Sequence, residues 1–163
     1  MIKNYLNKII EKENLSMYES YDAMLRIMSG DVSNILLSAF LIALKSKGET
    51  SDEVAGFVRA MREKSIKINV DNAIDVCGTG GDSSGTFNIS TAVAFVVAGA
   101  GIKVAKHGNR SVSSNSGSAD VLKELGVNIE MKPQQAEEAL NKIGIAFLFA
   151  HLYHPAMNYA AET

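Results

Sequence analysis

A run of eight residues, Asp75-Val76-Cys77-Gly78-Thr79-Gly80-Gly81-Asp82, places three glycines in four positions directly after a short apolar segment. Glycine lets the main chain approach a ligand closely and turn consecutive N–H groups toward it, which makes a concave nest for an anion. Ten residues beyond the first of these glycines, Asn88-Ile89-Ser90-Thr91 opens an apolar stretch with helical character. A helix start offers unpaired N–H groups and the positive end of the helix dipole. Together the two segments predict a phosphate-binding site.

Two familiar phosphate-binding loops do not match this segment. A dinucleotide-binding fingerprint needs a glycine at the position of Ser83, and an acidic residue about 20 residues further on, where the chain has none. A Walker-type loop ends in Gly-Lys-Ser or Gly-Lys-Thr, and neither tripeptide occurs in the sequence. A plain tight turn is the alternative for one glycine pair, but the helix start that follows favours a ligand site.

A second polar cluster, Lys106-His107-Gly108-Asn109-Arg110, follows the apolar segment 102–105. Ligands of parallel sheets gather at the carboxyl ends of the strands, so we expect both clusters to share one mouth. The lysine and the arginine can neutralise phosphate, and Gly108 permits a sharp turn. The serine-rich stretch 111–118 that follows is either a solvated loop or a ligand clamp. His151 and His154 bracket a tyrosine, and each alone is more often structural than functional.

The charge distribution supports an anionic ligand. Net charge is -2, which excludes a generally basic protein that binds nucleic acid or membranes. No Asp or Glu lies between Asp82 and Asp120, whereas Lys103, Lys106 and Arg110 do. A stretch that keeps its bases and omits acids attracts anions.

The chain carries no sign of secretion or of a membrane span. The single cysteine, Cys77, can form no internal disulfide, which fits a reducing, cytoplasmic setting. The N-terminal residues lack the apolar centre of a signal peptide. The apolar run 92–100 is too short to span a bilayer, and it predicts a buried helix.

Residues 1–64 have the periodicity and the capping residues of four short helices. Ser16 with Glu19 and Thr50 with Glu53 are capping boxes, and Ser33 can cap a further helix. Short loops between short helices predict a small antiparallel helical assembly. Its apolar surface exceeds what four such helices can bury, which favours either a packing partner or a second subunit.

After a linker at 65–72, short apolar runs alternate with helical stretches. Strands are predicted at 73–77, 102–105 and 145–149, and helices at 90–100, 119–125 and 134–143. Alternating strands and helices are typical of a mostly parallel sheet covered by helices. The fold class is therefore α/β, with a small N-terminal α-helical domain followed by the start of a larger α/β domain.

The ordered motifs resemble those of the anthranilate phosphoribosyltransferase family over the whole chain. The resemblance rests on segments 78–82, 88–91, 106–110, 116–120 and His154-Pro155-Ala156-Met157. It implies transfer of phosphoribose from phosphoribosyl pyrophosphate to the amine of anthranilate, in tryptophan biosynthesis, with Mg²⁺. It also implies a homodimer formed through the helical domain, in a fold of the nucleoside phosphorylase and phosphoribosyltransferase type. The implied domains are residues 1–72, rejoined by a helix starting near residue 155, and 73–154, which begin the α/β domain.

The resemblance also implies roles for individual residues. Lys106 would stabilise the transition state, and no residue would serve as nucleophile or base. Ser90 would be a magnesium ligand, and anthranilate would meet Gly78, Asn109, His107 and His154. Phosphoribosyl pyrophosphate would be bound by Gly78, Gly81, Asp82, Thr86, Asn88, Ile89, Ser90, Thr91, Lys106, His107, Gly108, Asn109, Arg110, Ser111, Val112, Ser113, Ser114 and Ser118.

The family has an arginine that contacts anthranilate shortly beyond the His154 segment, and an Asp-Glu magnesium pair much later. This chain ends at Thr163, before both, and Ala161-Glu162 replaces the more usual Ala-Pro. The resemblance therefore implies part of a longer enzyme, with weak or absent activity of its own.

Three alternatives remain at the level of the sequence. A pyrimidine nucleoside phosphorylase has a similar architecture, but the segment 106–110 argues against it. A non-catalytic relative that binds nucleic acid would need a broad basic face, whereas the first 72 residues hold ten acids and ten bases. The third alternative is a dimerising helical module with an incomplete site.

Overall fold

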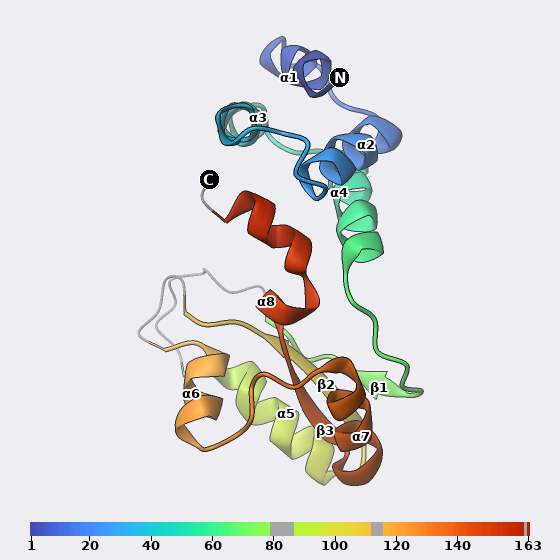
Figure 1. The fold of residues 1–163 in the computed structure, drawn as a ribbon, viewed down its shortest axis with the longest axis vertical. Coiled ribbons are helices and arrows are strands. Elements are labelled where there is room, and N and C mark those ends of the chain that lie inside the picture. The colour runs from blue at the N-terminus through green and yellow to red at the C-terminus, as the bar shows by residue number, and fades with distance from the viewer. Residues whose placement is uncertain (79–86, 112–115, 162) are drawn as a thin grey trace. The chain divides into compact units, whose positions relative to one another are not determined.

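The computed structural model describes residues 1–78, 87–111, 116–161 and 163 (Figure 1). These residues form two compact units, which are described separately. The first comprises Met1–Ser65 together with His154–Thr163, and the second comprises Ile66–Tyr153. The boundary falls after Ser65, so residues 66–72 of the segment that the sequence assigned to a linker belong to the second unit. Ile66 N donates to Tyr153 O over 2.8 Å, and Asn69 N donates to Glu137 Oε1 over 2.6 Å.

The first unit consists of four helices and one 3₁₀ helix. These are α1 (Ile2–Ile10), α2 (Met17–Ile27), α3 (Asn34–Lys47), α4 (Ser51–Lys64) and η1 (Pro155–Ala160). Both predicted capping boxes are confirmed, and the Ser33 side chain accepts from Leu36 N at the start of α3. Each cap satisfies N–H groups that the helix itself leaves unpaired.

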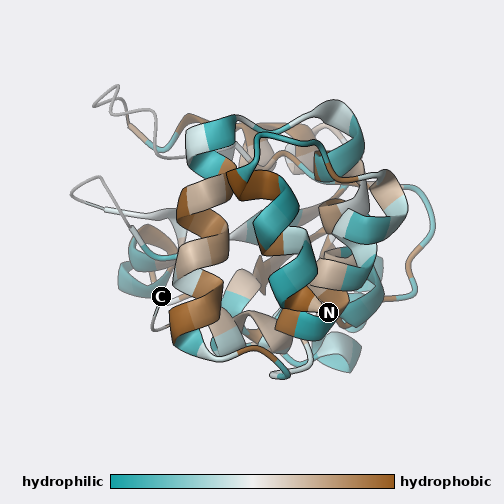
Figure 2. Ribbon diagram, turned by 90° about the horizontal axis from the view of Figure 1, so that it is seen from above, coloured by the Kyte–Doolittle hydropathy of each residue, from teal (hydrophilic) through white to brown (hydrophobic). Residues whose placement is uncertain are grey.

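The core of the first unit gathers apolar side chains from all four helices, with Ile9 and Phe40 fully buried at its centre. Large apolar side chains nevertheless remain exposed on the same helices. Figure 2 colours the ribbon by hydropathy, and its brown stretches mark where apolar residues occur along the helices. The most exposed are Ile10, Tyr18, Ile35 and Ile42. The helices therefore present more apolar surface than their own core covers.

The second unit is a three-stranded parallel sheet with helices on both faces. Its strands are β1 (Ala73–Ile74), β2 (Lys103–Gly108) and β3 (Ile145–Phe149), in the order β1-β2-β3. Both strand pairs are parallel, as the alternating pattern predicted. The helices are α5 (Ile89–Gly99), α6 (Ser118–Glu124), α7 (Pro133–Ile143) and α8 (Ala150–Tyr153).

Two small cores lie on opposite faces of this sheet. Leu140 of α7 packs with Ala105 and Leu148 on one face, and Leu122 of α6 packs with Phe147 on the other. This division follows from the alternation of side chains along each strand. A sheet with helices on both faces keeps apolar residues on both sides, as parallel sheets do.

Helix α5 is much less buried than the sequence predicted. Only Thr91 and Ala94 are buried, whereas Val96 is 73% exposed and Phe95 is 47% exposed. The prediction of a buried helix is wrong for this chain because α5 packs on β2 and β3 with one side only. Among the described residues, no helix is long and apolar enough to cross a membrane.

Candidate functional site

The structure brings the described part of the first polar cluster, residues 75–78, and the second cluster, residues 106–110, to one edge of the sheet in the second unit. Strands β1 and β2 are parallel neighbours, so the chain leaves both at the same edge, toward Gly78 and Asn109 respectively. The first turn of α5 reaches this edge as well. A Cβ placed on Gly78 would lie 4.0 Å from Ser90 Oγ, which puts the start of the glycine loop beside the start of that helix.

Asn88 connects the start of α5 to the serine-rich segment. It occupies the N-cap position without a side-chain capping bond. Its Nδ2 instead donates to Ser116 O over 3.5 Å. The next residue, Ile89, is half exposed, and Thr91 is buried in the first turn. The helix start and residue 116 therefore border the same site.

Asp120 holds the two ends of the serine-rich segment together. Its Oδ2 accepts from Gly117 N over 2.9 Å and from Ser111 N over 3.1 Å. These two main-chain hydrogen bonds, the first of them the stronger influence, lower the pKa of the Asp120 carboxyl below its ordinary value. The role was missed by sequence reasoning, although an acid in the first turn of a helix commonly accepts from main-chain N–H groups there, as Asp120 does from Gly117 N.

Asn109 anchors the main chain directly after β2. Its carbonyl oxygen accepts from Ala119 N at 3.2 Å and from Ser118 Oγ at 3.3 Å. Its side-chain Oδ1 accepts from Arg110 N at 2.9 Å. The predicted binding residues Asn109, Arg110, Ser111 and Ser118 therefore form one hydrogen-bonded corner at the start of α6.

Two glycines allow this corner to pack. A Cβ on Gly117 would lie 2.3 Å from Ser111 N and 2.5 Å from the carbonyl carbon of Arg110. A Cβ on Gly108 would lie 2.2 Å from Ser118 Oγ and 2.6 Å from the ring of Phe147. Gly108 was predicted to form a sharp turn, but it is the last residue of β2. Its role in the structure is close packing.

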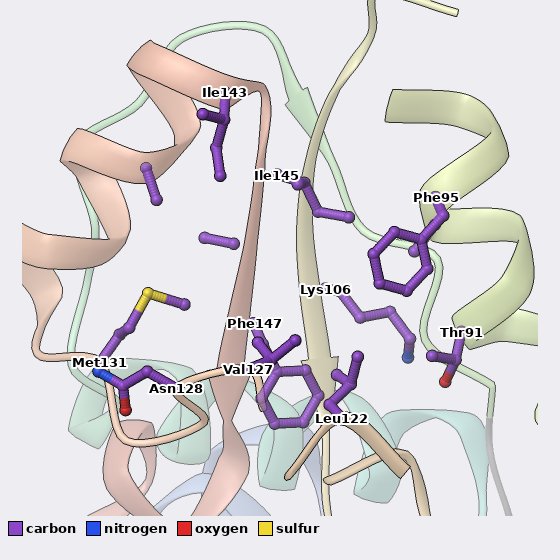
Figure 3. A pocket seen from close by; sticks show the side chains of 13 residues that line it. Thr91, Phe95, Lys106, Leu122, Val127, Asn128, Met131, Ile143, Ile145 and Phe147 are labelled. Carbon is purple, nitrogen blue, oxygen red and sulfur yellow. The ribbon is translucent and has the colours of Figure 1, made fainter. Parts of the chain in front are cut away.

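Lys106 is buried inside β2, not exposed in a turn as the sequence suggested. It is 3% exposed, and its Nζ donates to His107 O over 2.7 Å. Its side chain points into a cavity of about 260 Å³ with an almost wholly apolar lining, toward Thr91 of α5 (Figure 3). Thr91 Oγ1 is buried and has no hydrogen-bond partner among the described residues. An ammonium and a hydroxyl thus meet beside the first turn of α5, where the helix dipole also favours an anion.

His107 is held on the other side of β2 by Asp75. Asp75 Oδ1 accepts from His107 N over 3.1 Å, and Asp75 Oδ2 lies 3.0 Å from His107 Nδ1. Partial burial raises the pKa of the Asp75 carboxyl, but the hydrogen bonds from His107 outweigh burial, and the pKa lies below its ordinary value. The His107 ring also packs edge-on against Tyr153 at 6.2 Å. Sequence reasoning gave Asp75 no role, because the predicted strand 73–77 placed it inside the strand, whereas β1 ends at Ile74.

Other predicted site residues are not placed at this edge. Gly81, Asp82, Thr86, Val112, Ser113 and Ser114 lie outside the described residues. His154 belongs to the first unit, where it borders a small hollow with Met28 and Met61. Its role toward anthranilate stays a prediction.

Magnesium fits this site only through oxygen atoms. Ser90 Oγ at the start of α5 is a hard oxygen donor, which suits Mg²⁺. No cluster of three or more His, Cys, Asp or Glu side chains that could hold a metal occurs in the described part of the chain. Mg²⁺ keeps much of its coordination from water and substrate phosphates, so one hydroxyl can contribute but cannot hold the ion alone.

The helical unit and the parallel α/β unit each match a domain of one protein family. The a/b domain of a glycosyl transferase family matches residues 70–163, and the helical bundle domain of the same family matches residues 3–65. The chain belongs to this glycosyl transferase family.

Among the individual relatives that it matches are anthranilate phosphoribosyltransferases. The chain is 54% identical over 162 residues to the one from Geobacillus stearothermophilus, which covers 99% of this chain and 48% of the relative. It is 53% identical over 163 residues to the one from Petrotoga mobilis, covering 99% and 47%. The chain thus spans about half the length of the curated relatives that it matches.

Solved structures agree with these matches. The anthranilate phosphoribosyltransferase from Thermus thermophilus superposes with a TM-score of 0.87 at 43% identity, covering 96% of this chain and 48% of that one. The enzyme from Saccharomyces cerevisiae in complex with PRPP and Mg has a TM-score of 0.87 at 27% identity, covering 99% and 49%. A variant of the yeast enzyme is in complex with 4-fluoroanthranilate, with a TM-score of 0.82 at 25% identity, covering 99% and 47%.

Proposed function

We propose that this chain carries the phosphoribosyl pyrophosphate-binding part of an anthranilate phosphoribosyltransferase. The complete protein would transfer phosphoribose to the amine of anthranilate, giving N-(5-phosphoribosyl)anthranilate and pyrophosphate, in tryptophan biosynthesis. One observation carries the proposal: Gly78, where the glycine-rich segment begins, lies beside the first turn of α5, and the buried Lys106 points toward Thr91 in that same turn. The bound PRPP and Mg of the yeast relative support the same ligand here.

The reaction requires little covalent chemistry from the protein. Anthranilate brings its own nucleophile, an aromatic amine, so the site must align this amine with the anomeric carbon. As the bond to pyrophosphate breaks, negative charge grows on the departing oxygens. Lys106, the N–H groups of the first turn of α5 and the hydroxyl of Thr91 are the groups of this chain that stabilise that charge. A positively charged sugar carbon is expected in the transition state, as in other substitutions at this atom.

Magnesium when bound neutralises pyrophosphate oxygens. Ser90 is the residue of this chain that we propose as its ligand, through Oγ. Asn109, at the corner beside Gly108, is proposed to contact anthranilate, together with Gly78, His107 and His154.

We further propose that the complete protein is a homodimer formed through the helical unit and that it is located in the cytoplasm. Exposed apolar side chains on α1, α2 and α3 support a second copy as the partner. The single cysteine fits a reducing compartment.

Calorimetric titrations of this chain with the ligands of each candidate function test the proposal. With Mg²⁺ present, phosphoribosyl pyrophosphate should bind saturably at one site per chain, and single-stranded DNA should not bind. Binding of DNA without phosphoribosyl pyrophosphate would support the nucleic-acid-binding alternative. Binding of uridine together with phosphate, in place of anthranilate, would support the nucleoside phosphorylase alternative.

A further inference from the structure

Asp120, in the first turn of α6, uses a single oxygen to hold two main-chain donors from different segments. Its Oδ2 accepts from Gly117 N over 2.9 Å and from Ser111 N over 3.1 Å. Ser111 belongs to the segment that follows β2, whereas Gly117 directly precedes α6. The side chain of Asp120 therefore connects the chain that leaves β2 to the start of α6.

The residues around this connection include those that the proposed function assigns to the ligand. Asn109 O accepts from Ser118 Oγ over 3.3 Å and from Ala119 N over 3.2 Å. Asn88, at the start of α5, donates through Nδ2 to Ser116 O over 3.5 Å. A movement of the main chain at residues 111 and 117 would therefore shift the start of α6 and its hydrogen bond to the start of α5.

The negative charge of Asp120 opposes the binding of a pyrophosphate nearby. Asp120 is the first acidic residue after Asp82 in the sequence. A carboxylate repels phosphate oxygens, so its charge by itself would weaken binding. The main-chain hydrogen bonds from Gly117 and Ser111 lower the pKa of its carboxyl, so Asp120 is ionised at neutral pH. What Asp120 contributes to the site is therefore an oxygen acceptor and not a charge.

We propose that Asp120 is a positioning residue for phosphoribosyl pyrophosphate, whose Oδ2 fixes the main chain at Ser111 and Gly117 so that Asn109, Ser111 and Ser118 meet the ligand. The inference rests on the proposed function, which assigns these three residues to that ligand. A main chain that is already fixed costs less conformational entropy to order when the ligand binds. Asp120 itself does not touch the ligand.

Two substitutions separate the oxygen of Asp120 from its charge. Both hydrogen bonds end on Oδ2, so the single amide oxygen of Asp120→Asn can accept both while the charge is removed. Asp120→Ala removes the acceptor and the charge together. Gln135→Ala is the matched control, because Gln135 Oε1 accepts from Lys132 N over 2.9 Å at the start of α7. This control removes a main-chain acceptor from a helix start of the same unit that carries no proposed ligand residue.

Amide hydrogen exchange, followed by NMR on the full chain without ligand, tests the positioning of the main chain. We expect the N–H groups of Ser111 and Gly117 to exchange about 5- to 10-fold faster in Asp120→Ala than in the native chain. Their exchange in Asp120→Asn and in Gln135→Ala should match the native chain. Unchanged exchange in Asp120→Ala would overturn the positioning role.

The consequence for the ligand is measured by calorimetry with phosphoribosyl pyrophosphate and Mg²⁺. Asp120→Asn should bind as tightly as the native chain or more tightly, whereas Asp120→Ala should bind about 10-fold more weakly. Native affinity in Asp120→Ala, or equal losses in Asp120→Asn and Asp120→Ala, would overturn the inference. An equal loss in Gln135→Ala would also overturn it, because it would reflect a general loss of stability.

Failure of this inference is distinguishable from failure of the proposed function. If the native chain binds no phosphoribosyl pyrophosphate, the proposed function fails and the role of Asp120 toward the ligand fails with it. If the native chain binds and Asp120→Ala binds equally well, only the inference about Asp120 is overturned.

Discussion

At the scale of the residue, the helical unit depends for its stability on the buried ion pair Lys47–Glu53. Glu53 is fully buried, and Lys47 Nζ lies 2.9 Å from Glu53 Oε2. The carboxylate also accepts from Leu15 N at 2.8 Å and from Thr50 N at 2.8 Å. Lys47 donates further to Asn14 Oδ1 and Gly48 O. One ion pair thus connects the segment before α2 to the turn between α3 and α4.

Glu53→Gln should destabilise the helical unit strongly. The change leaves the Lys47 ammonium buried without its counter-charge, which costs about 3 kcal/mol in comparable pairs. Urea unfolding followed by circular dichroism measures the loss. Glu138→Gln, which breaks the exposed pair with Lys142, is the control and should change the free energy of unfolding far less, because water screens that pair. Equal losses in the two variants would contradict the account of the buried pair.

Stability should fall at acidic pH because the folded state depresses carboxyl pKa values. Burial raises the pKa of Glu53, but hydrogen bonds from Lys47 and from main-chain N–H groups outweigh burial and leave it below its ordinary value of 4.5. The unfolded chain then binds protons before the folded chain does, so the stabilisation is present above 4.5 and is lost as pH falls through the folded pKa. Unfolding free energies measured at a series of pH values should decline below 4.5 in the native chain and less steeply in Glu53→Gln. Parallel curves would show that Glu53 is not the group responsible.

Local residue patterns predicted the helix starts well. Ser16, Ser33 and Thr50 act within three residues of themselves, so the signal for each lies in the sequence alone. Asp75 and His107 are 32 residues apart and meet only because β1 and β2 pair. The periodicity of the sequence does not show that two residues so far apart in the chain will pair.

At the scale of the element, the corner between β2 and α6 can pack only because residue 117 is a glycine and has no side chain. Gly117→Ala should weaken phosphoribosyl pyrophosphate binding, because a Cβ 2.3 Å from Ser111 N forces segment 109–111 to move. Gly99→Ala is the matched control, since nothing lies within 4 Å of its Cβ and its φ is ordinary. Titration of both variants should show weaker binding only for Gly117→Ala. Unchanged binding by Gly117→Ala would show that this corner does not contribute to the phosphoribosyl pyrophosphate site.

The strands show where sequence patterns stop being informative. The pattern predicted 73–77 as one strand, but β1 pairs with β2 at two positions only, Ala73 with Lys103 and Ile74 with Val104. Beyond them the side chain of Asp75, not main-chain pairing, connects the two segments. The boundaries of β3 matched because its five residues are apolar and flanked by Gly144, a clear helix end. An apolar pattern, such as that of α5, predicts that a segment can be buried. It does not predict which other part of the molecule covers that segment.

At the scale of the whole molecule, the chain spans about half the length of its curated relatives. We expect it to bind phosphoribosyl pyrophosphate with little or no turnover, because Ser90 is the magnesium ligand that we propose and one hydroxyl cannot hold the ion alone. Loss of anthranilate fluorescence in the presence of phosphoribosyl pyrophosphate and Mg²⁺ measures turnover. Sustained turnover by this chain alone would contradict the expectation.

The central claim is that the edge where β1, β2 and α5 meet binds a sugar pyrophosphate through Lys106. The most direct measurement is the dissociation constant of phosphoribosyl pyrophosphate, by calorimetry with Mg²⁺, for the native chain, Lys106→Ala and Lys103→Ala. Lys103 lies on the same strand and donates to Asn141 Oδ1 at 2.7 Å, so it is a matched control away from the cavity. The account predicts binding that Lys106→Ala weakens by about 10- to 100-fold, with anthranilate affinity nearly unchanged. Equal binding by Lys106→Ala and the native chain, or a larger loss of anthranilate affinity, would contradict it.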